Sequence, residues 1–124
     1  MTTPTPSLEP GMTTAPVHQS PPPMPGRTPR GLREAIIRYT PQLLTEFEAQ
    51  WRQNIADTYN LAAAPAFVTR WWETFAIERD PELAAHVHDL EDRAADASDA
   101  AQAMELLEEV SRIKYSVRDL EPGE

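Results

Sequence analysis

The stretch AAAPAFVTRWWETFAIERDPE, residues 62–82, holds a helix start, two adjacent tryptophans and the start of a further helix. Pro65 suits the first turn of a helix, and Asp80 followed by Pro81 is typical of the next one. Successive helical residues are rotated by about 100°, so Trp71 lies inside the apolar stripe and Trp72 lies at its edge. The stretch therefore predicts an amphipathic helix over 65–79 whose second tryptophan needs a separate explanation.

The same signal, a polar or small residue followed by proline, recurs along the chain. It occurs at Thr28-Pro29, Thr40-Pro41, Ala64-Pro65 and Asp80-Pro81. A Thr or Asp before the proline accepts hydrogen bonds from the free amides of the first turn. These signals predict helices over 29–38, 41–59 and 65–79 and a helical segment from 81 onward. Since no segment shows the alternating pattern of a strand, the predicted fold class is all-α.

The predicted core comes from the inward faces of the helices over 41–59 and 65–79, whose apolar residues are spaced three or four apart. Three short helices give only a thin core, so the segment after residue 80 must pack against something. Trp72 then either packs under this segment or contacts a partner. The predicted core residues are Leu44, Phe47, Trp51, Ile55, Phe67, Val68, Trp71 and Phe75.

The segment after Pro81 shows a heptad-like apolar seam that runs from Leu83 to Met104. Asp96, Ser98 and Asp99 are candidate helix caps within it, so we predict a break near 96–99. The first 29 residues hold nine of the 13 prolines, which is typical of a chain that cannot form a core. The predicted organisation is a disordered leader (1–28), a helical domain (29–95) and an acidic helical arm (96–124).

The net charge of −9 lies entirely in the C-terminal third. Residues 1–79 are balanced, whereas residues 80–124 carry 13 acidic and four basic side chains. An acidic arm favours basic partners and disfavours nucleic-acid phosphates, although acidic faces also serve solubility alone. The absence of cysteine, of a signal peptide and of an apolar run long enough to span a membrane predicts a cytoplasmic protein.

The sequence shows few residue patterns that are typical of catalysis, metal binding or phosphate binding. His86 and His88 are the only clustered histidines, and on a helix they point about 200° apart, too far to share a metal. The chain has no cysteine nucleophile and no glycine-rich phosphate loop. We therefore expect no enzyme activity, no metal and no cofactor.

Three pieces of the sequence together resemble a small, functionally uncharacterised family of actinobacterial proteins. The pieces are TPRGLREAI (28–36), LLTEFEAQWRQNIADTYNLA (43–62) and FVTRWWETFAIERDPEL (67–83), and the resemblance covers about 27–85. Genes of this family often lie beside small toxins of the RelE/ParE type, so the resemblance implies an antitoxin-like or accessory role. The residues that carry it are Phe47, Glu48, Trp51, Arg52, Arg70, Trp71, Trp72, Asp80 and Pro81.

The implied mechanism is neutralisation of a small basic protein by an acidic amphipathic helix laid across it. Trp72 would contact the partner, five apolar residues would anchor it, and three glutamates would steer it. Two alternatives remain open: a homo-oligomer that uses 81–120 as a coiled coil, and a DNA-binding regulator, for which 65–79 lacks a basic stripe. The anchors are Leu106, Leu107, Val110, Ile113 and Val117, and the steering residues are Glu105, Glu108 and Glu109.

Overall fold

The computed structural model describes residues 20–124, and over this range the chain is helical with no strand. This confirms the all-α prediction and the break between the last two helices. The α-helices are α1 (Pro29–Tyr39), α2 (Leu44–Trp51), α3 (Ala64–Glu78), α4 (Pro81–Ala95) and α5 (Ala100–Arg118). Short turns flank α2 and α3: η2 (Pro41–Leu43), η3 (Arg52–Ala56) and η4 (Leu61–Ala63).

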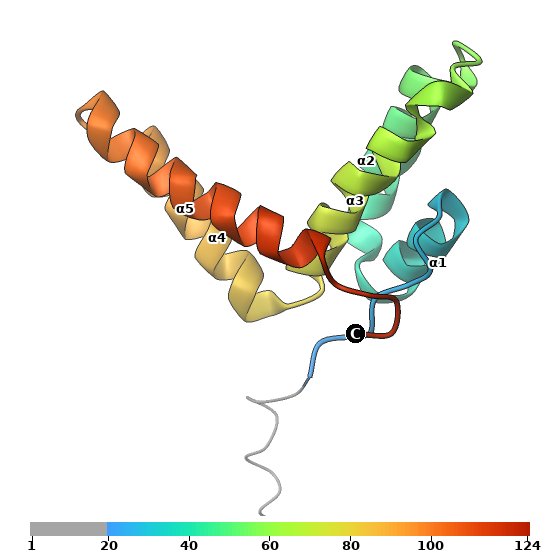
Figure 1. The fold of residues 1–124 in the computed structure, drawn as a ribbon, viewed down its shortest axis with the longest axis horizontal. Helices are drawn as coiled ribbons and strands as arrows, with labels where there is room; N and C mark the ends of the chain where they lie inside the picture. Colours follow the sequence, from blue (N-terminus) through green and yellow to red (C-terminus); the bar gives the residue numbers. More distant parts are fainter. Residues whose placement is uncertain (1–19) are drawn as a thin grey trace, which may run out of the picture.

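Two helical hairpins diverge from a common base in the shape of a V (Figure 1). One limb, the α2–α3 arm, comprises residues 41–78, and the other, the α4–α5 hairpin, comprises residues 81–118. Helix α1 lies beside the α2–α3 arm on the side away from the hairpin (Figure 1). The C-terminus and the first described residues lie together at the closed end of the V.

Three helices begin at the side-chain caps that their sequences suggest. Thr28 Oγ1 accepts a hydrogen bond from the amide of Gly31 at 2.9 Å, at the start of α1. Asp80 caps α4 by accepting from the amides of Glu82 (3.1 Å) and Leu83 (3.3 Å). At α5, Asp99 accepts from the amide of Gln102 at 2.8 Å. The cap at Asp99 explains why the C-terminal segment forms two helices.

The helix predicted over 41–59 is less regular than expected. Thr40 makes no capping hydrogen bond, and its buried hydroxyl has no partner among the described residues. The first turn is a 3-10 turn, and the last is a π turn in which Asp57 N donates to Arg52 O at 2.8 Å. The helix ends at Ala56, and Tyr59 adopts a left-handed conformation with φ of 53°.

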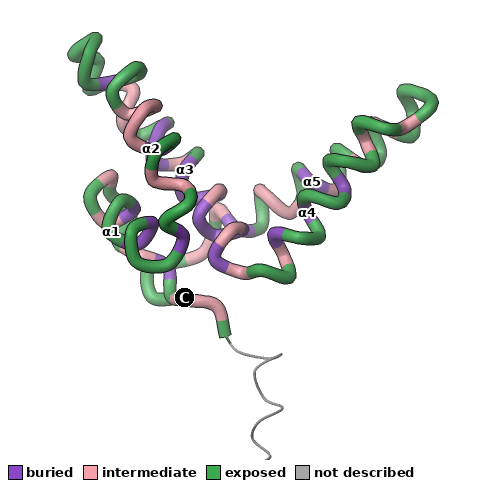
Figure 2. The backbone as a smooth tube through the Cα atoms, turned by 180° about the vertical axis from the view of Figure 1, so that it is seen from behind, coloured by how far each residue is buried: buried purple, intermediate pink, exposed green. Residues whose placement is uncertain are grey.

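Burial is concentrated where the helices meet, and the tips of both limbs are exposed (Figure 2). Of the eight predicted core residues, six are buried, and Leu44 and Trp51 are half-buried against the same cluster. The Phe67 ring lies at the centre of an aromatic group, with centroids 5.1 Å from Phe47, 5.3 Å from Trp51 and 6.4 Å from Trp71. The local pattern of the sequence is thus sufficient to identify the inner faces of α2 and α3.

Trp72 has 0% exposure, so the prediction that it contacts a partner is wrong and the alternative of burial holds. The Arg27 guanidinium lies 4.1 Å from the centre of its ring. The same guanidinium donates to the backbone carbonyls of Arg118 (2.7 Å) and Leu120 (3.1 Å). Helix α3 also packs against α1, α4 and α5. Trp72 is therefore a core residue, buried where the segments at the two ends of the described chain contact each other.

Residues 20–28 pack on the helices, which corrects part of the leader predicted over 1–28. Met24 is 3% exposed, and its carbonyl accepts from Gly123 N at 2.8 Å. The carbonyl of Pro22 accepts from Arg79 Nη1 at 2.6 Å. We call residues 20–28 and 118–124 together the terminal clasp. The rest of that prediction, for residues 1–19, lies outside the described part of the chain.

Gly31 and Arg79 also help to hold the terminal clasp against the helices. A Cβ at Gly31 would lie 2.6 Å from the carbonyl oxygen of Gly26, so the chain before α1 can approach the helix only because residue 31 is glycine. Burial lowers the pKa of Arg79, while the carboxylates of Asp80 and Glu124 act in the opposite direction. Arginine remains charged at physiological pH despite such a shift. Its hydrogen bond to Pro22 is therefore charge-assisted.

Candidate protein-binding groove between the two limbs

The apolar stripe of α5 that was predicted to anchor a partner packs mainly against the protein itself. Val110 and Val117 are 4% and 7% exposed, and Leu106 and Ile113 are half-buried against the core cluster. The physical reason is that α5 packs along α4 and also rests on α3. An amphipathic stripe covered in this way cannot bind a partner without unfolding the hairpin. These four predicted anchors are therefore core residues.

The remaining residues of the predicted site stay at the surface. Leu107 is 47% exposed, and Glu105 and Glu108 are exposed. Glu109 is half-buried and forms an ion pair with Arg112 on the same helix. The structure thus retains one apolar anchor on the exposed surface of α5, together with two carboxylates that form no ion pair with the described residues.

An exposed apolar row extends from Leu107 toward the tip of the hairpin. Ala100, Ala103, Met104 and Leu107 are spaced three or four residues apart, so they share one side of α5. Met104 is 60% exposed, and Ala103 is half-buried. The heptad pattern places Met104 inside the seam. The structure places it outside because the break at 96–99 gives α5 its own helical phase.

This apolar row faces the space between the limbs. Lys114 follows Leu107 by seven residues and therefore lies on nearly the same side of α5. Lys114 lines a cavity of about 180 Å³ together with Arg70 of α3 and Glu91 of α4. Side chains from three helices therefore meet at the base of the V. The row of α5 continues outward from that cavity.

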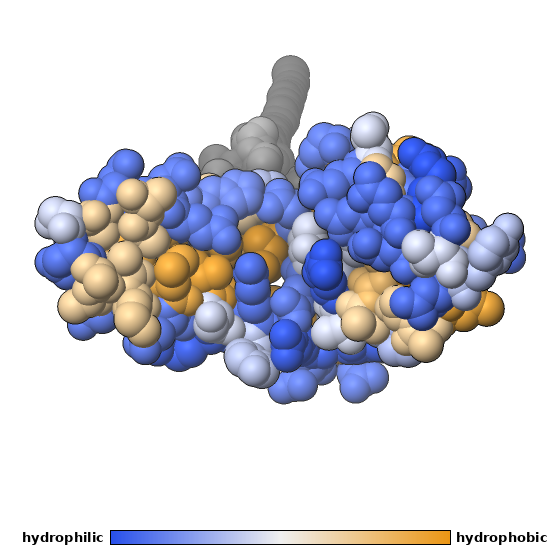
Figure 3. All heavy atoms as spheres, turned by 90° about the horizontal axis from the view of Figure 1, so that it is seen from above, coloured by the Kyte–Doolittle hydropathy of each residue, from blue (hydrophilic) through white to orange (hydrophobic). Residues whose placement is uncertain are grey.

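The α2–α3 arm forms the opposite wall. Ala63, Ala66 and Arg70 line an adjoining cavity of about 310 Å³, and Arg70 belongs to both cavities. At the tip of this arm, Tyr59 and Leu61 are 89% and 72% exposed. Figure 3 shows an apolar patch toward each end of the molecule, separated by a hydrophilic band. We call the space between these surfaces the inter-limb groove. The apolar row of α5 lies on one side, Ala63 and Ala66 lie beside the polar Asn54 and Asn60 on the other, and the base is charged.

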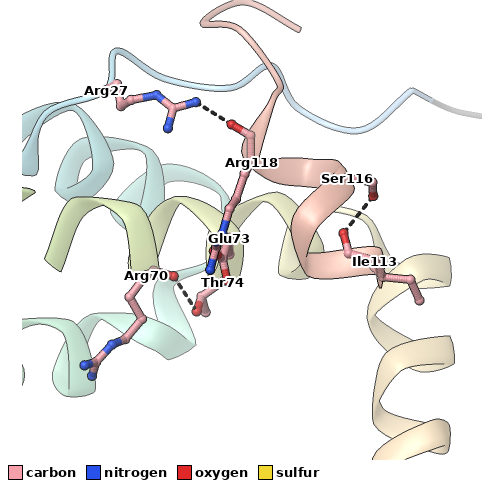
Figure 4. A network of polar contacts seen from close by, with 7 residues as sticks. All are labelled: Arg27, Arg70, Glu73, Thr74, Ile113, Ser116 and Arg118. Carbon is pink, nitrogen blue, oxygen red and sulfur yellow. Dashed lines mark hydrogen bonds and ion pairs between the residues drawn. The ribbon is translucent and has the colours of Figure 1, made fainter. Parts of the chain in front are cut away.

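The floor is held by a network that joins α3 to α5 and to the terminal clasp (Figure 4). Glu73 is only 8% exposed and forms an ion pair with Arg118. The hydrogen bond to Glu73 raises the pKa of Arg118 above its ordinary value. The carbonyl of Arg118 in turn accepts from Arg27. These contacts fix the angle between the α4–α5 hairpin and α3, and hence the width of the groove.

A second contact ties α4 to the end of α3. His88 Nε2 lies 2.8 Å from Glu78 Oε2, and both residues line the smaller cavity. Across residues 20–124 no three histidine or acidic side chains gather closely enough to hold a metal ion. None of the helices in that range is both long and apolar enough to cross a membrane. The groove can therefore interact with a ligand through apolar and charged side chains.

The fold and the groove define a small all-α protein with two diverging helical hairpins. A sequence profile for a family of unknown function (DUF6247) matches residues 20–115, and the chain therefore belongs to that family. The match confirms the expectation of a functionally uncharacterised family and extends beyond the resemblance over 27–85. No curated protein and no solved structure matches the chain.

Proposed function

We propose that this protein is a non-enzymatic interaction module that holds a basic segment of another protein in the inter-limb groove. The observation that carries the proposal is the exposed apolar row on α5, with Met104 60% and Leu107 47% exposed. Glu108 borders this row, Glu105 lies on the opposite exposed side of α5, and Met104 and Leu107 are left uncovered by the other described residues. An apolar row bordered by acidic residues suits an amphipathic helix with basic flanks.

The contact energy and the association rate would come from different residues. Met104 and Leu107 would supply the desolvated centre of the interface, where most binding energy resides. The carboxylates of Glu91, Glu105 and Glu108 would accelerate encounter with a basic partner and make the rate dependent on salt. Ala63 and Ala66 on the α2–α3 arm would contact the other side of the occupant.

The sharper form of the proposal is an antitoxin-like role in an actinobacterial cytoplasm, with a small basic toxin as the partner. It is supported by the 13 acidic residues among residues 80–124 and by the resemblance of the sequence. The binding surface differs from the stripe expected from sequence, because Val110 and Val117 are buried. A complete α5 is therefore required, and deleting residues 98–124 would destroy the core as well as the site.

The two other functions have less support. Self-association through the apolar row would bring Glu108 of two copies close together, and like charges oppose that contact. For DNA binding, α3 carries a single basic side chain, Arg70. Both alternatives remain possible outcomes of the test below.

The test is affinity capture of partners from the native host by the full chain. Met104→Glu/Leu107→Glu places charge on the row without altering a buried residue. Ile37→Glu is the matched control, because Ile37 is 43% exposed on α1, away from the groove. We expect wild type and the control to retain the same small basic protein and the double variant to lose it. Circular dichroism melting should show that all three proteins are folded.

Retention of the partner by the double variant would exclude this surface. Recovery of the protein's own chain alone would favour the homo-oligomer instead. Capture that does not weaken between 50 and 500 mM salt (about a threefold change in Debye length) would contradict electrostatic steering.

A further inference from the structure

A second concave site lies on the other side of the α2–α3 arm, between α1 and α2. It encloses about 440 Å³ and is lined by the first residues of α1 and by residues 47–52. This volume lies within the range of small-ligand sites, roughly 300–1,000 Å³. The site shares no lining residue with the two cavities of the inter-limb groove. It is therefore independent of the function proposed above.

The floor of this α1–α2 pocket is aromatic and rigid. Phe47 is 3% exposed, and its ring lies 5.1 Å from Phe67 and 5.2 Å from Trp71. Trp51 is half-buried, with its ring 5.3 Å from Phe67 in an edge-to-face arrangement. Because the core holds both side chains, the apolar surface of the pocket exists before any ligand arrives. Preformed apolar surface of this kind is typical of ligand sites.

Three arginines and a single carboxylate surround that floor. Glu48 accepts from Arg33 Nε at 2.7 Å, so this carboxylate is already occupied and Arg33 is fixed in place. Arg30 has only a 3.4 Å contact with Glu34, and the two side chains are 90% and 67% exposed. Arg52 forms no ion pair with any residue of the described range. Two guanidinium groups are thus available to a ligand.

A site with excess positive charge is unusual on a chain whose net charge is −9. Arginine presents a planar fork of donors that matches carboxylate and phosphate groups. An apolar floor beside two such groups suits a molecule with one flat apolar part and one anionic part. Arg30 and Arg52 are not needed to hold α1 in place, because α1 packs through its buried residues Leu32 and Ile36.

We propose that the α1–α2 pocket binds a small amphipathic oxyanion. A flat apolar body would lie on Trp51 and Phe47, and a carboxylate or phosphate group would lie between Arg30 and Arg52. A helix from a second copy fits less well, because the pocket is lined by about one turn of α1 and little more than one turn of α2. A helical occupant would need a groove that continues along a helix axis.

The test is an NMR titration of the full chain with 2-naphthoate and 2-naphthyl phosphate. Two further compounds separate the contributions: 2-naphthalenemethanol has the rings without the charge, and acetate has the charge without the rings. We expect both naphthyl anions to shift the amides of 30–33 and 47–52 and the indole N–H of Trp51. The neutral naphthyl compound should bind about tenfold more weakly, since a charge-assisted hydrogen bond contributes at least that factor. The tighter of the two anions identifies the preferred head group.

Arg52→Gln should weaken naphthyl-anion binding about tenfold for the same reason. Arg112→Gln is the matched control, because Arg112 is an exposed arginine on α5. The Met104→Glu/Leu107→Glu protein should bind the anions normally, which separates this proposal from the interaction module.

Three results would overturn the proposal. One is equal affinity for the neutral and anionic naphthyl compounds, and another is unchanged affinity in Arg52→Gln. The third is a shift of the same amides on raising the protein concentration alone, which would assign the pocket to a second copy.

Discussion

The two limbs of the V are built from different kinds of side chain. The α2–α3 arm packs through a group of aromatic rings centred on Phe67. The α4–α5 hairpin packs through aliphatic residues such as Val87, Leu90 and Val110, and no aromatic pair occurs in it. An aromatic side chain buries about 150–250 Å², so a few rings give the arm a dense core. The hairpin has a thinner seam and leaves an apolar row uncovered.

This difference separates a limb with large buried side chains from one with small ones. The rings bury a large apolar area within the arm, whereas the hairpin packs α4 along α5 through smaller side chains and also contacts α3. Its attachment to α3 includes the ion pair between Glu73 and Arg118 and the contact between His88 and Glu78. The limb with the weaker core of its own is thus the one that carries the exposed surface.

The largest expected loss of stability comes from truncating one buried side chain in each limb. Phe67→Ala should lower the free energy of unfolding by about 3–5 kcal/mol, because it leaves a cavity among the rings. Leu90→Ala, at a similarly buried site in the hairpin, should cost about 2–3 kcal/mol. Urea unfolding followed by circular dichroism measures both. An equal or larger loss for Leu90→Ala would break the comparison between the limbs.

A smaller effect is expected at the attachment of the hairpin. Arg118→Ala would leave Glu73 buried without its partner, and the free energy of unfolding should fall by more than in the control variant. Arg112→Ala is the control, because its ion pair with Glu109 lies on the surface and should contribute less than about 0.5 kcal/mol. Equal losses in the two variants would show that the hairpin is attached by apolar packing alone.

The smallest effects concern the two tips, and they differ in sign. Tyr59→Gly should stabilise the α2–α3 arm by about 0.5–1 kcal/mol, since tyrosine at a φ of 53° is strained and glycine is not. Asp99→Ala should destabilise the hairpin by about 1 kcal/mol through loss of the α5 cap. Thermal unfolding of the two variants beside wild type tests both. A stabilising Asp99→Ala would mean that the cap is replaced by another group.

The elements of the fold could be predicted from sequence because their signals are local. A proline after Thr28 or Asp80 marks a helix start within two residues, and Asp99 marks the break that separates α4 from α5. The spacing of apolar residues identifies the inner face of α2 and of α3 in the same way. Each of these signals depends on neighbours within one or two turns of helix.

The candidate site could be predicted only in part, because an amphipathic stripe does not specify what covers it. The stripe through Val110 and Val117 is equally consistent with an external partner and with α4 and α3, and the structure shows the latter. The sequence also leaves the burial of Trp72 undecided, because Arg27 reaches over it to backbone carbonyls 91 and 93 residues away. A contact with backbone carries no signature in the side chains of the sequence. The π turn at Arg52–Ala56 gave no signal that we can identify.

The terminal clasp has a consequence for the way this chain is made. Its two halves are separated by nearly the whole described sequence, since Met24 binds Gly123 and Arg27 binds the carbonyl of Leu120. During synthesis, N-terminal elements fold first, and α1 to α3 emerge from the ribosome before α5 does. Throughout that interval the indole of Trp72 lacks the helix and the carbonyls that complete its cover. The nascent protein therefore presents an apolar surface accessible to chaperones, which disappears only when α5 has left the ribosome and packed on α3.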